Sequence, residues 1–200
     1  MVPWEAACLG LTLASCCGLN TCLPILVAAL AARFFHCPVV HGLHWATTDI
    51  GLATIAVATI VEIVIDKIPV IDHAFAALAT FIRPAAAAFL AYAVFPAHSE
   101  VSQAVFALAG GAPSALAAHG VRAGVRTSIS LATFGCGGAF LSLAEDIAAA
   151  LLSVLAFLAP VLALLLVVMI VAALAFVIFR ALGVKREKAR MRRCVQAVRR

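Results

Sequence analysis

The chain has 200 residues, of which 66% are hydrophobic and only 12% are charged, whereas soluble domains are about half apolar and a quarter charged. One soluble core of this size could not bury so much apolar surface, so the composition excludes an ordinary soluble protein and predicts an all-α bundle of transmembrane helices. The charges are also segregated: residues 1–179 contain five Lys or Arg and eight Asp or Glu, whereas residues 180–200 contain nine and one.

The first apolar segment covers residues 6–35 and is interrupted near its middle. Gly18, Asn20 and Pro24 fall close together there, and this combination predicts a kink or a locally unwound stretch of a membrane helix. Residues 12–26 are therefore a candidate re-entrant segment. The start of the chain lacks the basic residues of a cleaved signal peptide, so we expect this segment to be retained as a span.

Two apolar segments with recognisable ends follow. Residues 46–66 begin beside several candidate N-caps, and their helix is expected to end before Pro69. Residues 73–96 contain Pro84 and have Asp72 as a candidate N-cap. For the segment 46–66, the candidate N-caps are Thr47, Thr48 and Asp49.

Three more apolar segments complete the set, given that about 20 helical residues cross a bilayer. Residues 103–119 form a short segment that is weakened by glycine and proline. Residues 130–159 open with a glycine-rich stretch, so residues 130–145 are a second candidate re-entrant segment. Residues 160–182 form an uninterrupted apolar span, whose first residue is a proline suited to a first helical turn.

The distribution of basic residues predicts the orientation, because cytoplasmic loops are enriched in Lys and Arg. The basic C-terminal end is placed in the cytoplasm, and counting back through six spans places Lys67, Arg122 and Arg126 on the same side. The opposite loops, 36–45 and 97–102, contain no Lys or Arg. We therefore expect about six spans, with both termini in the cytoplasm.

The chain is expected to divide into a transmembrane domain, residues 1–182, and a basic cytoplasmic tail, residues 183–200. The tail is read as a helical extension close to anionic lipid, where each basic charge contributes about 1 kcal/mol. No aromatic side chains alternate with its charges, so we expect membrane lipid as a partner and no nucleic acid.

A few charged residues remain inside the apolar segments. A charge at the bilayer centre costs about 2.5–3.5 kcal/mol on insertion scales, so such side chains usually face the bundle interior and have partners. Glu62 and Asp66 are four residues apart on one helix face, and Arg83 falls near the middle of its segment. The expected counter-ion of Arg83 is Glu62, Asp66 or Asp72, whereas Lys67 by itself is typical of an interface anchor.

A second charged group lies between the fourth and fifth segments. His119, Arg122 and Arg126 occupy one helix face at spacings i, i+3 and i+7. The arginines are either ordinary positive-inside residues or part of a site. Gly120 and Gly124 form a small-xxx-small pair on another face, which would allow close helix packing.

A third group comprises Ser142, Glu145 and Asp146, and its spacing matches a capping box with Ser142 as the N-cap and Glu145 at N3. A role in binding a substrate is the alternative. The whole candidate network for substrate binding or ion pairing is Glu62, Asp66, Lys67, Asp72, Arg83, His119, Arg122, Arg126, Glu145 and Asp146.

Neither metal nor cofactor is expected. The seven cysteines show no zinc-like spacing and fall mainly in apolar runs, where free Cys packs as a small hydrophobe. His36, His41 and His44 lie near Pro38 and Gly42, which argues against the regular helical turn that a metal site would need. We interpret these histidines as solvated loop residues.

These residues together resemble the bacterial multi-pass membrane proteins grouped as domain of unknown function 4126. The resemblance spans residues 18–146 and implies a small inner-membrane protein with a helical fold, without implying an activity. The matching stretches are Gly18-Leu19-Asn20 with Pro24 and Arg33, Glu62 through Asp66-Lys67-Ile68-Pro69 to Asp72, Arg83-Pro84, His119-Gly120 with Arg122-Ala123-Gly124 and Arg126, and Ser142 with Glu145-Asp146.

Buried charge beside broken helices favours a small transporter or permease with a site for an anionic solute or a lipid phosphate, since discontinuous helices offer backbone groups to ions. The alternative is a structural or assembly factor whose ion pairs hold helices together, with a homo-oligomer as one option. No catalytic motif is present, so an enzyme is not expected.

Overall fold

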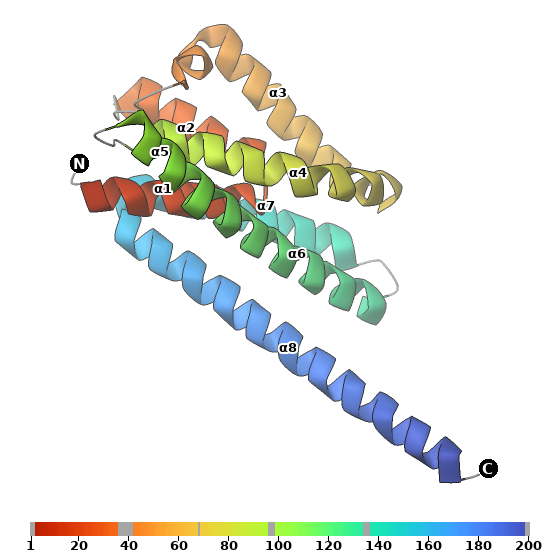
Figure 1. Ribbon diagram of the computed structural model, residues 1–200. Helices are drawn as coiled ribbons and strands as arrows, with labels where there is room; N and C mark the ends of the chain where they lie inside the picture. Colours follow the sequence, from red (N-terminus) through yellow and green to blue (C-terminus); the bar gives the residue numbers. More distant parts are fainter. Residues whose placement is uncertain (1–2, 36–41, 68, 96–98, 134–136, 199–200) are drawn as a thin grey trace.

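The computed structural model describes residues 3–35, 42–67, 69–95, 99–133 and 137–198, with side chains except at 69–77, 127–133, 137–139, 178 and 181–198. Every regular element within these ranges is helical (Figure 1). In chain order they are α1 (Pro3–Cys17), α2 (Cys22–Phe35), the 3₁₀-helix η1 (His44–Thr47), α3 (Asp49–Ile65), α4 (Pro69–Val94), α5 (Glu100–Phe106), the π-helix η2 (Ala107–Gly111), α6 (Ala112–Thr133), α7 (Gly137–Leu158) and α8 (Pro160–Val198).

The outer surface of this bundle is apolar. Ile50, Phe81 and Leu158 are 81%, 77% and 78% exposed, and they belong to three different helices. Among the described residues, three helical stretches have the length and apolarity to cross a membrane: Glu100–Arg126, Phe140–Leu158 and Pro160–Val177. The predicted all-α membrane bundle is therefore confirmed.

The interruption predicted within residues 6–35 is present, but it does more than kink one helix. α1 ends at Cys17, α2 begins at Cys22, and the two helices run in opposite directions (Figure 1). The segment is therefore a helical hairpin, which differs from the single span expected from its length. The physical reason is that Gly18, Asn20 and the following residues make a complete turn, whose polar groups are satisfied by other helices.

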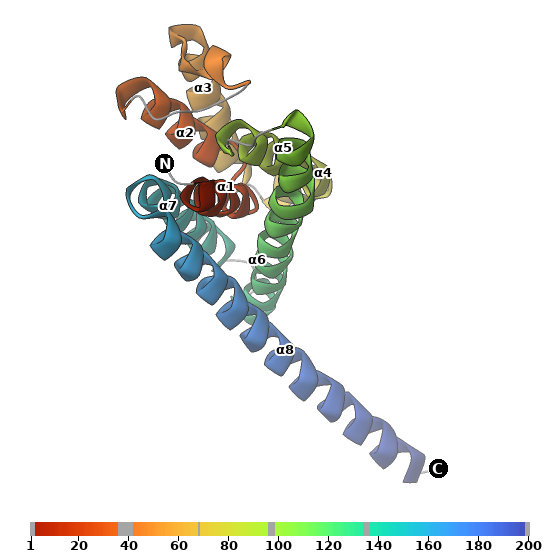
Figure 2. The ribbon, with the colours of Figure 1, turned by 60° about the vertical axis from the view of Figure 1, so that its left-hand side comes forward.

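α1 occupies the centre of the bundle. Viewed nearly end-on in Figure 2, it is surrounded by α2, α4, α6, α7 and α8. Leu13, Ala14 and Cys17 are completely buried, and the core around them is rich in alanine, including Ala91 and Ala115. Small side chains let the helix backbones approach closely, which is how membrane helices gain packing energy.

The boundaries of α3 and α4 differ partly from expectation. Thr48 caps α3, since its Oγ1 accepts a hydrogen bond from the Gly51 amide at 3.1 Å. α4 begins at Pro69, so Asp72 lies within the helix and is not its N-cap. Proline suits the first turn of a helix because its missing N–H has no partner there anyway; Pro69 separates two helices and also starts the second.

The fourth segment is longer than its predicted range of 103–119. α5, η2 and α6 follow one another without a break from Glu100 to Thr133. Gly110 and Gly111 do not end the helix; they lie within η2, where the chain adopts one π turn. A π turn inserts an extra residue without breaking the helix, so glycine here marks a change of helix type.

α7 and α8 form an antiparallel pair that is joined at Ala159. α7 is unbroken from Gly137 to Leu158, whereas residues 130–133 belong to the end of α6, so the predicted segment 130–159 includes parts of two helices. α8 continues through residue 182 to Val198, and no helix end marks the boundary expected between the membrane domain and the tail. With 39 residues, α8 is about 58 Å long, and its C-terminal half projects from the bundle (Figures 1 and 2).

The hairpin also changes the topology. Within the described residues, one pass along the bundle is made by each of α1, α2, α3, α4, the continuous stretch from α5 to α6, α7 and α8, which is an odd number. The two ends of the chain therefore lie at opposite ends of the bundle (Figure 1). Two termini on one side would require an even number. The positive-inside pattern places Arg122 and Arg126 in a loop, whereas both lie within α6, and Arg122 is only 4% exposed.

Candidate functional site

The hairpin turn between α1 and α2 is a short polar stretch inside the apolar bundle. Its backbone closes with hydrogen bonds from the Gly18 amide to the Ser15 carbonyl (3.0 Å) and from the Leu19 amide to the Cys16 carbonyl (2.9 Å). Asn20 is completely buried, and its Oδ1 accepts a hydrogen bond from the Leu23 amide at 3.1 Å, which caps the start of α2.

Arginines bind the carbonyl groups at the end of α1. Arg83 Nη1 donates to the carbonyl oxygens of Gly18 (2.7 Å) and Leu19 (3.1 Å). Arg122 Nη1 also donates to the Leu19 carbonyl. The C-terminal end of a helix carries a partial negative charge, so the two guanidinium groups compensate a helix end that has no access to water.

A carboxylate binds the opposite end of the break. The backbone amides of Thr21 and Cys22 donate to the two carboxylate oxygens of Glu62, both at 2.9 Å. The N-terminus of a helix is a natural anion site because its first amides lack partners and its dipole is positive there. Cations thus hold the end of α1, and an anion holds the start of α2.

These side chains also pair with one another. Arg83 Nη2 lies 3.7 Å from Glu62 Oε1, so Glu62 is the counter-ion among those expected for Arg83. Arg122 lies between two carboxylates, with Nη2 at 2.5 Å from Asp66 and Nε at 2.8 Å from Glu145. Three helices, α3, α6 and α7, therefore meet at one arginine.

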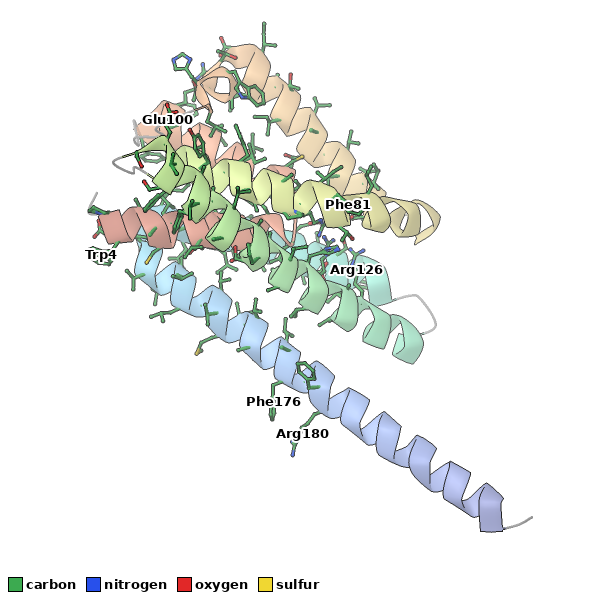
Figure 3. The ribbon with its side chains drawn as sticks, viewed as in Figure 1. Trp4, Phe81, Glu100, Arg126, Phe176 and Arg180 are labelled. Carbon is green, nitrogen blue, oxygen red and sulfur yellow. The ribbon has the colours of Figure 1, made fainter. Side chains whose placement is uncertain are left out.

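Arg126 extends this cluster by one helical turn. It is placed on α6 and points into the bundle (Figure 3), with Nε at 3.4 Å from Glu145 and Nη2 at 3.9 Å from Asp66. Two arginines and two carboxylates, Arg122, Arg126, Asp66 and Glu145, thus alternate within ion-pair distance of one another.

On its other side the cluster reaches α7 through Asp146. Asp146 Oδ1 accepts a hydrogen bond from Asn20 Nδ2 at 3.1 Å, and its Oδ2 lies 3.6 Å from the ammonium group of Lys67. Lys67 is thus part of the network as well as near the end of α3. Asp146 links the hairpin turn to α7.

The charges are buried by protein. Arg83, Arg122, Glu62, Asp66 and Asp146 are each between 2% and 6% exposed. Burying one ion costs several kcal/mol after relaxation, and the cost is offset only when partners and hydrogen bonds are complete. Four basic side chains and four carboxylates in the described cluster balance one another in charge. Their hydrogen bonds are less complete, because the buried Arg83 Nε has no hydrogen-bond partner among the described residues.

His119 joins the cluster on its outer side. Its Nδ1 lies 3.3 Å from Arg83 Nη1, and its Nε2 lies 3.4 Å from Thr80 Oγ1. Because an arginine can only donate, Nδ1 acts as the acceptor and the ring is neutral, with its proton on Nε2. The predicted residues Glu62, Asp66, Lys67, Arg83, His119, Arg122, Arg126, Glu145 and Asp146 thus come together; the side chain of Asp72 lies outside the described part.

Two local predictions were wrong. Ser142 is not an N-cap, because α7 begins five residues earlier at Gly137; the capping-box spacing occurs inside a helix, where Glu145 pairs with arginine instead. Gly120 does not mediate close packing, since a Cβ there would meet nothing within 4 Å. The close approach on α6 is made instead by Ala115 and Ala118 against Gly18.

Sequence reasoning missed the backbone contributions and one ion pair. The carbonyls of Gly18 and Leu19 and the amides of Thr21 and Cys22 carry no signal in residue type. Arg33 Nη2 lies 2.6 Å from Asp49, an exposed pair between α2 and α3 outside the cluster. No group of three metal-ligating side chains occurs within the described ranges; His36 and His41 lie outside them.

The class of protein follows from these features: an α-helical membrane bundle built around a polar helix break that buried charges clamp. A family model matches residues 7–180, so the chain belongs to the family described as domain of unknown function DUF4126. No curated protein and no solved structure matches the chain.

Proposed function

We propose that this protein is a small permease of the bacterial inner membrane, with the clamped helix break as its site for an anionic solute. The observation that carries the proposal is the hairpin turn, where two helix ends meet inside an apolar bundle and are held by side chains of opposite charge. Discontinuous helices of this kind supply ion and substrate sites near mid-membrane in secondary transporters.

Helix lengths support a re-entrant hairpin. α1 and α2 have 15 and 14 residues, or about 22 and 21 Å, which is shorter than the roughly 30 Å of a hydrocarbon core. These lengths support a turn that lies within the membrane, at the level of Arg83 and Arg122. Re-entrant backbone is tolerated at such depth only where it is buried in protein or lines a polar cavity.

The chemistry of the cluster suits a phosphate or carboxylate group. Three arginines converge there, and guanidinium groups bind such anions through paired hydrogen bonds. An incoming anion would exchange with one of the carboxylates, and displaced carboxylates such as Glu62 and Asp66 can take up protons. In this way anion binding and proton binding would be coupled in one balanced network.

Flux through proteoliposomes tests the proposal. Purified protein is reconstituted, and uptake of labelled inorganic phosphate and of succinate is measured with and without a pH gradient. We expect saturable uptake of one of the anions that falls at least about tenfold in Arg83→Lys and Asp66→Asn. Arg33→Gln removes an exposed ion pair away from the cluster and is the control, which should transport normally.

No uptake of either anion by the wild-type protein, or equal uptake by both cluster variants, would contradict this proposal. Either result would favour the alternative function, a structural or assembly factor of the membrane. The balance of four basic side chains against four carboxylates in the described cluster supports that alternative. The double variant Asp66→Asn with Arg122→Gln, in which both charges are removed together, separates the two functions. A purely structural network should tolerate this change, whereas a transport site should lose flux while the protein still folds.

A further inference from the structure

A pocket of about 200 Å³ lies beside the cluster, between α1, α6, α7 and α8. Its walls are apolar except at Ser15, Arg122 and Glu145. From this charged pair the pocket extends toward Leu152 and Val167, which pack with Cys16 as a small separate buried cluster. Glu145 and Leu152 are seven residues apart on α7, so the apolar part is about 10 Å long.

The α8 side of this pocket lies at the outer surface of the bundle. On the α8 side its lining residues Ile170 and Leu174 are 42% and 37% exposed. Apolar cavities of this size stay dry but accept apolar guests. In a membrane the available guest is hydrocarbon, so an acyl chain is the occupant that fits the walls and the route of entry.

The charges at the wall define which amphiphile fits. Glu145 lines the pocket, and Arg126 lies behind it, with Nε at 3.4 Å from the Glu145 carboxylate. Their side chains are 11% and 17% exposed, compared with 2–3% for Asp66 and Arg122. Glu145 is therefore the carboxylate most easily displaced from the pair of arginines. A phosphate diester offers oxygen acceptors to both guanidinium groups and would replace Glu145 with similar geometry.

We propose that this pocket binds one acyl chain of an anionic phospholipid, with the phosphate at Arg122 and Arg126 in place of Glu145. The inference deepens the proposed function and rests on it only for the claim that the arginines of the cluster bind an anionic group. The apolar walls position the chain but select little, because lipid tails are as apolar as the walls. Selectivity comes from the charged end.

Native mass spectrometry of the purified protein in detergent measures this binding. The probes are lysophosphatidylglycerol and lysophosphatidylcholine with the same acyl chain, and inorganic phosphate alone. We expect the anionic lysolipid to bind about tenfold or more tightly than the zwitterionic one. Glu145→Gln removes the competing carboxylate and should increase this preference, whereas loss of a merely structural ion pair would leave it unchanged.

A matched pair on α8 tests the acyl site. Val171 lines the pocket, and Val168 lies one turn away with 56% of its surface exposed. Val171→Phe should fill the pocket and weaken binding of both lysolipids by about tenfold, while Val168→Phe should bind as the wild type does. Ala148→Phe narrows the pocket from α7 and covers the case in which Val171→Phe does not fold.

Each of the following results would overturn the inference: equal binding of both lysolipids, no change in preference in Glu145→Gln, or inorganic phosphate binding as tightly as the anionic lysolipid. Dimers without retained lipid would assign the pocket to a second copy of the chain and would also overturn it. Lipid retention without anion flux would contradict the transport proposal alone, and flux without lipid retention would contradict this inference alone.

Discussion

Two serines of α7, Ser142 and Ser153, are completely buried but differ in their hydrogen bonding. Ser153 Oγ donates to the Ala149 carbonyl at 2.6 Å, one turn earlier. Ser142 Oγ has no hydrogen-bonding partner among the described residues. A buried hydroxyl without a partner has lost its hydration and gained nothing in return, so the two positions should respond differently to the same change.

Ser142→Ala is expected to leave the free energy of unfolding unchanged or to raise it by at most about 3 kcal/mol, because it removes an unsatisfied polar group. Ser153→Ala is expected to lower it by about 1 kcal/mol, because it removes a formed hydrogen bond. Denaturant unfolding in detergent micelles measures both values. Equal destabilisation would show that the Ser142 hydroxyl has a partner, such as a bound water or ion.

At the same scale, the residue types of the cluster could be predicted and their pairing could not. Ionisable side chains in an apolar sequence identified Arg83, Arg122 and Asp66, because the cost of burial requires that such residues have partners. Which carboxylate meets which arginine depends on the relative depth and rotation of separate helices. Arg122 therefore reaches Asp66 and Glu145, two residues 56 and 23 positions away, without any signal in the local sequence.

At the scale of elements, the close contact between the hairpin turn and α6 depends on one glycine. A Cβ at Gly18 would lie 2.4 Å from the Ala115 carbonyl oxygen and 2.7 Å from Ala118 Cβ. Both neighbours belong to a helix whose backbone cannot shift alone. Gly18→Ala should therefore separate α1 from α6 and lower the free energy of unfolding by about 1–3 kcal/mol.

Gly120→Ala is the matched control for this change. Gly120 lies on α6 near the same level, but a Cβ there meets nothing within 4 Å. Alanine is favoured over glycine within a helix by about 1 kcal/mol, so Gly120→Ala should be neutral or stabilising. Thermal unfolding in detergent, compared for both variants, tests the pair; a stable Gly18→Ala protein would contradict the close packing.

Helix existence was predictable for every apolar segment, whereas helix continuity was not. Glycines predict an interrupted helix both at Gly18 and at Gly110, and the outcomes are opposite. Gly18 lies in a complete chain reversal, while Gly110 and Gly111 lie in a π turn inside a continuous helix. The difference is tertiary. Arg83, Arg122 and Glu62 supply partners for the broken backbone at Gly18, and a reversal without such partners would be too costly in a membrane.

At the scale of the whole molecule, the fold predicts a specific topology. If the basic end of α8 lies in the cytoplasm, then Trp4 and Glu100, which lie at the other end of the bundle (Figure 3), face the outside. Phe176 and Arg180 lie on α8 away from the bundle in the same view, with the guanidinium carbon of Arg180 5.8 Å from the Phe176 ring centroid. An outside N-terminus is the reverse of the arrangement predicted from six spans.

Protease protection of epitope tags at the two ends decides between the arrangements. In inside-out vesicles an N-terminal tag should be protected, and a C-terminal tag should be digested. Right-side-out spheroplasts should give the reverse pattern. Digestion of both tags in inside-out vesicles would restore two cytoplasmic termini and contradict the passage of the hairpin along the bundle.

The hairpin turn has a consequence for biosynthesis. α1 and α2 leave the ribosome before the other described helices, but Asp146, which holds Asn20, is synthesised 126 residues later. Until α3, α4, α6 and α7 have been made, the turn carries exposed carbonyl and amide groups that lipid cannot satisfy. The first part of the chain therefore has to be kept at the membrane surface or shielded by the insertion machinery, and it reaches its final place only after most of the polypeptide has been translated.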